Sequence, residues 1–281
     1  MMQKFLDKYI IFLYNLQFEA IKNSIILNTS DLNNKKFKEE SKHTYLLEAS
    51  LQFIKNKTGN FFEFGVHRGI SLKMCSELIP TMNFFGFDSF EGFPNDGRPD
   101  WKQDFKLESS QIPKFNKNVT IIKGYFANTL PRFVKEFKRK IDFINIDCDI
   151  YSSTNEVFKI LNTKIKSGCI IHFDEFFNYY DYPWNESLAF FEFLLQHNKS
   201  CKVLAFSKNI ISLDFILYHL NNYYRNNVSL PKIDNKNYRQ QLVVQIVDSP
   251  INFKISNPLI QKKLDFLKNR FEVISKIRKN N

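Results

Sequence analysis

Short apolar runs recur through the middle of the chain, and segments with apolar residues at helical spacing separate them. Short apolar runs bounded by polar or glycine positions predict buried strands, whereas apolar residues three or four positions apart predict helices. This alternation predicts an α/β fold with a mostly parallel, seven-stranded sheet and helices on both faces. The expected strands are residues 60–64, 82–87, 119–123, 141–146, 169–173, 202–206 and 242–247.

The seventh strand has two candidates, residues 210–215 and residues 242–247, and we favour the second. Residues 207–240 are then an insertion with a helix near 213–224. Among the crossover helices, one is expected to begin near Pro131 with Thr129 as its cap, and another after Ser153 or Thr154, because hydroxyl side chains favour helix starts.

Helices are also expected at both ends of the chain. Residues 1–28 carry apolar residues at helical spacing, which favours a packing helix over a membrane-surface helix. A second helix, 44–55, leads into the first strand and is placed to lie over a cofactor cleft. From residue 258 onward an apolar stripe predicts a helix that docks on the domain or on a second subunit. The expected organisation is an N-terminal extension (1–41), one α/β domain (42–250) and a basic C-terminal helix (251–281).

The 281 residues carry a formal charge of +11, and residues 251–281 hold eight Lys or Arg and two acids, a net charge of +6. The abundance of Lys, Asn, Ile and Phe resembles the codon bias of an AT-rich genome, which weakens any inference from charge to nucleic acid. No nucleic-acid module, membrane span or signal peptide is apparent. Four scattered cysteines argue against a zinc site or a disulfide framework and favour a reducing cytoplasm.

A glycine turn follows the first expected strand. Gly65 and Gly69 flank it, and the next helix then presents free N–H groups to a ligand. The spacing Glu-x-Gly-x-x-x-Gly differs from the Gly-x-Gly-x-x-Gly of dinucleotide binders, which disfavours a nicotinamide oxidoreductase. It resembles motif I of class I S-adenosylmethionine (SAM) methyltransferases. Glu63 and Asp88, at successive strand ends, are the expected cofactor acids, with Asp88 on the ribose hydroxyls.

Four more acids follow the fourth and fifth strands: Asp147 and Asp149, then Asp174 and Glu175. The carboxyl ends of parallel strands meet at one edge, so these acids are expected to converge. Gathered carboxylates repel one another, which indicates a cation or a proton-transfer task. His67 and His172 also lie near this edge, and for both a structural hydrogen-bonding role is favoured.

Five blocks in order resemble the macrocin O-methyltransferase (TylF/MycF-like) family over about residues 42–196. They begin at Phe62, Phe87, Gly124, Ile146 and Ile171 and read FEFGVHRGIS, FDSFEGFP, GYFANTLP, IDCDIYSST and IHFDEF. The resemblance implies SAM as methyl donor, a hydroxyl, often on a sugar, as acceptor, and Mg²⁺. The family's metal acids carry over to Asp147 and Asp174, with Glu175 in place of a second Asp.

The sequence thus predicts a cytoplasmic SAM-dependent O-methyltransferase for a small, sugar-like acceptor, with a homodimer possible. The alternatives are a non-catalytic SAM-fold binding protein and a methyltransferase acting on nucleic acid or protein. The expected cofactor residues are Glu63, Gly65, Gly69, Asp88, Ser89, Tyr125 and Phe126; the catalytic residues are Asp147 and Asp149; and the metal ligands are Asp147, Asp174 and Glu175.

Overall fold

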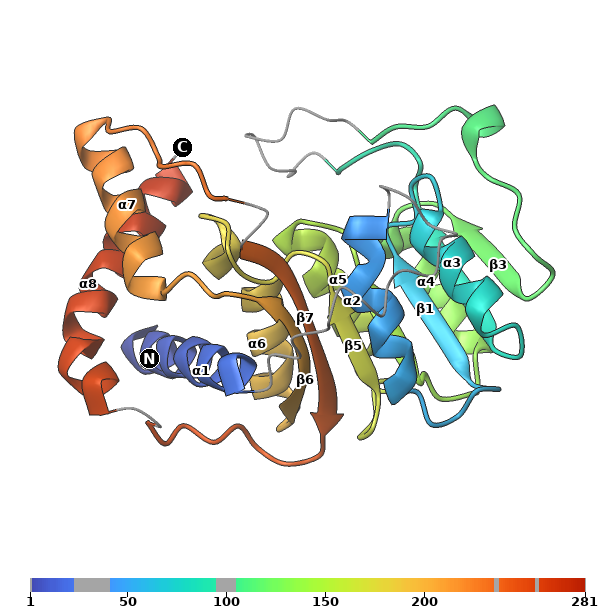
Figure 1. Ribbon diagram of the computed structural model, residues 1–281, viewed down its shortest axis with the longest axis horizontal. Coiled ribbons are helices and arrows are strands. Elements are labelled where there is room, and N and C mark those ends of the chain that lie inside the picture. The colour runs from blue at the N-terminus through green and yellow to red at the C-terminus, as the bar shows by residue number, and fades with distance from the viewer. Residues whose placement is uncertain (1, 23–40, 95–104, 235–237, 256–257, 281) are drawn as a thin grey trace.

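A seven-stranded sheet in the order β3-β2-β1-β4-β5-β7-β6 forms the centre of the computed structural model (Figure 1). The structure describes residues 2–22, 41–94, 105–234, 238–255 and 258–280. The first five strands are parallel, and β7 pairs antiparallel with both β5 and β6. The strands are β1 Asn60–Phe64, β2 Asn83–Asp88, β3 Val119–Lys123, β4 Phe143–Ile146, β5 Ile170–Phe173, β6 Ser200–Lys208 and β7 Tyr238–Val247.

The predicted Rossmann-like fold of class I methyltransferases is confirmed, and the seventh strand is the one favoured from the sequence. Residues 210–215 do not form a strand, since helix α7 (Leu213–Asn226) begins inside that segment. The inner strands are apolar along their length because helices cover both faces of a parallel sheet.

Helices α2 (Ser41–Ser50) and α3 (Ile70–Leu78) pack on one face of the sheet, and α4 (Phe126–Glu136), α5 (Tyr151–Leu161) and α6 (Glu186–Gln196) on the other. Successive residues of a strand point to opposite faces. The face under α4 to α6 is rich in phenylalanine rings, whereas the other face carries a smaller apolar cluster. Short 3₁₀ helices connect these elements at Leu51–Phe53, Ser109–Gln111 and Tyr182–Trp184.

Two crossover helices begin at other residues than the sequence predicts. Helix α4 begins at Phe126, so Pro131 lies inside it and the Thr129 hydroxyl bonds back to the Tyr125 carbonyl, 3.1 Å away, without capping the helix. Helix α5 begins at Tyr151, before either hydroxyl residue expected to cap it. In α4 packing decides the start, because the Phe126 ring lies edge-on to Phe64, with 5.4 Å between the ring centroids.

Helices α1 (Met2–Lys22), α7 and α8 (Pro258–Asn280) gather at the β6 end of the molecule, where both termini lie (Figure 1). The apolar stripe of α1 is buried: the Tyr9 hydroxyl donates to the Pro183 carbonyl, and its ring packs on Phe191. The stripe of α8 faces α1 and α7, and Phe271 stacks on Trp184 with 4.6 Å between ring centroids. Both helices therefore dock on their own chain. Among the described residues, no helix is long and apolar enough to cross a membrane.

Candidate functional site

The turn after β1 requires glycine at both of its ends. Gly65 has a φ of 91°, and a Cβ there would lie 1.7 Å from the backbone oxygen of Asp147, at the end of the neighbouring strand β4. Gly69 has a φ of 68° and immediately precedes α3. Positive φ favours glycine, and the missing side chain lets the ends of β1 and β4 approach each other. The N-terminus of α3 therefore opens at the carboxyl edge of the sheet.

Asp88, at the end of β2, fixes the shape of this turn. One carboxylate oxygen accepts the backbone N–H groups of Val66 and His67, at 2.8 and 2.7 Å, and the other accepts that of Phe90 at 2.7 Å. A carboxylate has about four acceptor positions, so one remains for a ligand hydroxyl. The Ser89 hydroxyl is also engaged, because it accepts from the Glu91 N–H and donates to the Gly92 carbonyl.

Glu63 lies beneath the turn and away from the cavity. It is completely buried, and its carboxylate accepts hydrogen bonds from the Ser71 hydroxyl at 3.0 Å and the Asn145 amide at 2.9 Å. Burial raises the pKa of Glu63 to about 8. Asn145 is also bonded to the His172 ring, so a polar row crosses β1, β4 and β5 at one register level.

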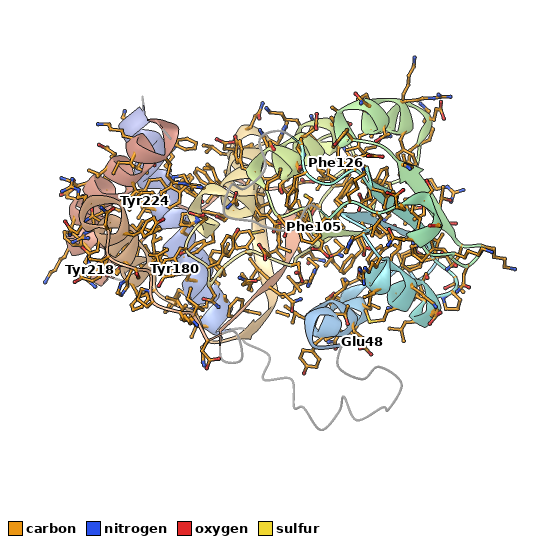
Figure 2. All side chains as sticks on the ribbon, turned by 90° about the horizontal axis from the view of Figure 1, so that it is seen from above. Glu48, Phe105, Phe126, Tyr180, Tyr218 and Tyr224 are labelled. Carbon is orange, nitrogen blue, oxygen red and sulfur yellow. The ribbon has the colours of Figure 1, made fainter. Side chains whose placement is uncertain are left out.

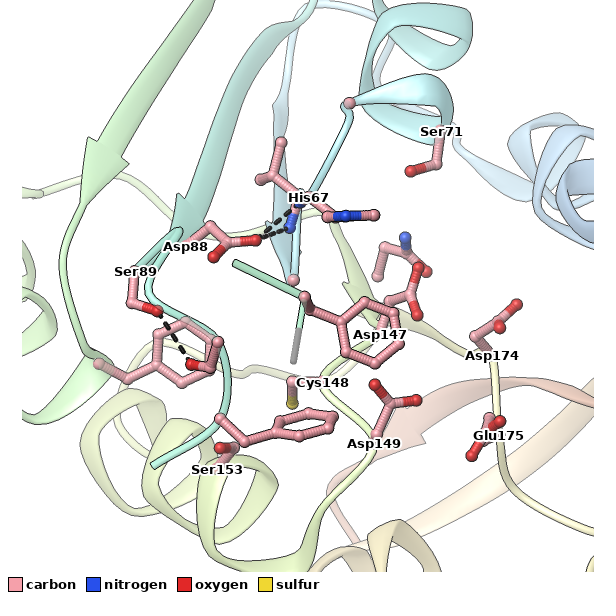
Figure 3. A pocket seen from close by; sticks show the side chains of 18 of the residues that line it. His67, Ser71, Asp88, Ser89, Asp147, Cys148, Asp149, Ser153, Asp174 and Glu175 are labelled. Atoms are coloured by element: carbon pink, nitrogen blue, oxygen red, sulfur yellow. Dashed lines mark hydrogen bonds between the residues drawn. The ribbon is translucent and has the colours of Figure 1, made fainter. Parts of the chain in front are cut away.

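A cavity of about 1180 Å³ opens at the carboxyl edge of the sheet (Figure 3). Asp88 and Ser89 lie on one side of it and the four strand-end acids on the other. The cavity therefore brings together every residue predicted for the site except Glu63: Gly65, Gly69, Asp88, Ser89, Tyr125, Phe126, Asp147, Asp149, Asp174 and Glu175.

The acids after β4 and β5 influence one another. Burial, and then the nearby charges of Asp174 and Asp149, raise the pKa of Asp147 well above its ordinary value. Glu186, buried at the start of α6, has its pKa raised by burial and then by Asp149, Glu175 and Asp174. Asp149 itself adopts a φ of 61°, an uncommon backbone conformation for a residue with a side chain. This region of the cavity thus favours a mixture of protonated and ionised carboxyls.

The predicted metal ligands do not form a ready metal site. Within the described ranges, no three His, Cys, Asp or Glu side chains are grouped so that they could hold an ion. Asp174 accepts a hydrogen bond from the Gln241 amide at 2.6 Å. The residues as placed therefore do not fit the Mg²⁺ that the family resemblance implies.

Several cavity residues are not among the site residues that the sequence predicts. Thr44 and Leu47 line the cavity, as expected of a helix lying over the cleft. Phe105 also lines it and packs edge-on against His67, with 5.4 Å between ring centroids. Phe105 belongs to the long segment between β2 and β3, and residues 95–104 of that segment lie outside the described part of the chain. Asn145 could not be predicted as a site residue from the sequence, because its contacts depend on the register of the strands beside it.

Comparison with protein families gives one match: residues 62–176 fit a family model described as a methyltransferase domain. The match covers less than half of the chain and includes the glycine turn, Asp88 and all four strand-end acids. It supports a methyltransferase. A comparison with curated proteins gives no significant match.

Similar folds are found among solved structures. The calicheamicin methyltransferase CalS11 is 21% identical, with 64% of this chain and 81% of that chain covered and a TM-score of 0.47. The O-methyltransferase NovP is 15% identical, with 73% and 79% covered and a TM-score of 0.49. An O-methyltransferase from Bacillus cereus in complex with SAH is 12% identical, with 78% and 86% covered and a TM-score of 0.41. These similarities are too low to carry a functional conclusion.

Proposed function

We propose that this chain is a SAM-dependent O-methyltransferase whose acceptor is a hydroxyl of a small, sugar-like molecule. One observation carries the proposal: a single cavity is lined on one side by the glycine turn and on the other by the strand-end acids. Methyl transfer needs donor and acceptor in one enclosed space, aligned for displacement. The sugar class comes from the resemblance of the five sequence blocks.

The strand order suggests how SAM is oriented along the carboxyl edge of the sheet. Tyr125 and Phe126 follow β3 and offer aromatic surface to the adenine, and Asp88 follows β2 and keeps one acceptor position for the ribose. The methionine end of SAM then lies beside the turn after β1. The acceptor occupies the remaining volume beside β4 and β5, next to the acids.

Asp149 is the proposed base. The acceptor hydroxyl must lose a proton as its oxygen attacks the methyl carbon, while the C–S bond breaks and the sulfonium becomes a neutral thioether. Burial, and then the nearby charges of Asp174 and Asp149, raise the pKa of Asp147 well above its ordinary value, so the protonated form of Asp147 is favoured and Asp149 is the proposed acceptor of the hydroxyl proton. Asp147 donates a hydrogen bond while Asp149 takes the proton. The proposed proton transfer uses these carboxyls alone, because the acids among the described residues do not form a group that fits Mg²⁺.

The test is methyl transfer from SAM to a panel of sugars and glycosides, followed by formation of the demethylated product and by the mass of the acceptor. Asp149→Asn should lower turnover by roughly 10²–10⁴-fold, the usual contribution of a general base. Affinity for SAM should stay unchanged, and Glu77→Gln, on the exposed outer side of α3, is the matched control. Undiminished turnover in Asp149→Asn would remove it as the base, and no transfer to any hydroxyl would reject the proposal.

A further inference from the structure

His172 lines the cavity and carries a buried polar atom that has no hydrogen-bond partner among the described residues. It lies in the middle of β5 with its ring almost fully buried, and it lines the cavity. Its Nδ1 lies 2.6 Å from the side-chain oxygen of Asn145. Its Nε2 is buried and has no hydrogen-bond partner in the part of the chain that the structure describes.

The polar row across the sheet determines which ring nitrogen carries the proton. The Asn145 amide nitrogen donates to the Glu63 carboxylate, so the amide oxygen of Asn145 is the atom that faces His172. An oxygen can only accept, and Nδ1 of His172 must therefore be the protonated nitrogen. In a neutral ring the other nitrogen is then a bare acceptor. Nε2 thus presents a lone pair.

A buried acceptor without a donor is unfavourable unless a ligand or water supplies the donor. The Nε2 lone pair is consequently suited to receive a hydrogen bond from a bound group.

The proposed function identifies that group. The methionine end of SAM lies beside β1 and β4, between the start of α3 and the strand that carries His172. The N–H groups at the start of α3 suit its carboxylate, which leaves the ammonium in need of an acceptor. We propose that Nε2 of His172 accepts a hydrogen bond from the α-amino group of SAM. This inference rests on the proposed function and assigns His172 to donor recognition.

Two substitutions of His172 distinguish the roles of its two ring nitrogens. His172→Asn keeps a donor near the position of Nδ1 and removes Nε2, whereas His172→Gln places an amide near the position of Nε2 and removes Nδ1. The probes are S-adenosylhomocysteine, which has the amino group, and 5′-methylthioadenosine, which lacks it. His172→Asn should lower affinity for S-adenosylhomocysteine by about tenfold and leave affinity for methylthioadenosine within twofold. His172→Gln should lower affinity for S-adenosylhomocysteine less than His172→Asn does.

The outcomes distinguish this inference from the proposed function. Equal losses for both probes, or a loss confined to the KM of the sugar acceptor, would overturn the role of His172 and leave the methyltransferase proposal standing. A parent protein that binds neither probe would overturn both. The tautomer is tested on the unmodified protein by ¹⁵N NMR of labelled histidines: an unprotonated Nε2 that shifts on addition of S-adenosylhomocysteine supports the proposal, and a protonated Nε2 overturns it.

Discussion

Glu63 is an acid held in the interior, and its proton equilibrium affects folding. Its pKa rises from 4.5 to about 8, so the folded state binds the proton more tightly than the unfolded state. The resulting stability is complete below pH 4.5 and is lost as the pH rises toward 8. Each pKa unit corresponds to about 1.4 kcal/mol, so a rise of about 3.5 units makes the loss on the order of 5 kcal/mol.

Glu63→Gln should therefore flatten the dependence of unfolding free energy on pH between 5 and 8 (roughly the range in which this proton is released). The neutral amide can still accept from Asn145 and donate to the Ser71 hydroxyl. Urea unfolding at several pH values measures the effect, with exposed Glu77→Gln as the control. A Glu63→Gln protein that keeps the full slope of its parent would contradict the assignment of this proton to Glu63.

Gly65 and Gly168 allow backbone strain to be separated from steric overlap. The φ of Gly65 is 91° and that of Gly168 is 88°. A Cβ on Gly65 would overlap the Asp147 backbone oxygen, whereas a Cβ on Gly168 would have no described residue within 4 Å apart from its neighbours in the chain. Gly168→Ala should cost about 1–2 kcal/mol from its conformation alone. Gly65→Ala should cost several kcal/mol more and abolish SAM binding, as measured by urea unfolding and calorimetry. Equal costs at the two positions would show that the ends of β1 and β4 can separate.

At the level of elements, the buried strands were predictable and several helix starts were not. The run from Asn60 to Phe64 is apolar enough to identify β1 directly. The start of α4 was missed because Pro131 and Thr129 are typical helix-start residues, while the contact of Phe126 with Phe64 joins residues far apart in the sequence. Local preference gives way to such packing.

Strand register limits what the sequence shows of the site. The acids at strand ends could be predicted, because every parallel strand ends at the same edge. The row formed by Glu63, Asn145 and His172 could not, since it depends on which residue of β4 lies beside which residue of β1 and β5. Alternation within β1 does place Glu63 on the same face as Phe61, opposite Phe62 and Phe64.

Helix α8 illustrates an element whose contribution is packing. Phe271 is buried against Trp184 and Tyr9, whereas Phe266 on the same helix is 55% exposed (its neighbour Arg270 lies over the ring). Phe271→Ala should lower the unfolding free energy by about 3–5 kcal/mol, and Phe266→Ala by less than about 1 kcal/mol. SAM affinity should change in neither. A loss of SAM binding in a folded Phe271→Ala protein would connect α8 with the site.

Across the whole molecule, the packing helices and the cavity occupy different regions. Tyr218 and Tyr224 of α7 lie at one end, and Phe105 and Phe126 lie well away from them, toward the middle (Figure 2). The helices α1, α7 and α8 thus extend the β6 end of the sheet, while the cavity lies over β1, β2, β4 and β5. Binding in the cavity should stabilise the entire fold, since a ligand that binds only the folded state shifts the folding equilibrium.

Thermal unfolding with different ligands tests the donor at this scale. S-adenosylhomocysteine at a hundred times its Kd should add about 2.7 kcal/mol, which raises Tm by roughly 5 °C or more. NAD⁺ should leave Tm unchanged because the glycine spacing does not match dinucleotide binding.

Mg²⁺ alone should also leave Tm unchanged, since the described acids are not arranged as a three-ligand group. A rise in Tm with Mg²⁺ alone would show that Asp147, Asp174 and Glu175 can close around an ion. A rise in Tm with NAD⁺ but not with S-adenosylhomocysteine would show that the cavity binds a nicotinamide cofactor and not the methyl donor.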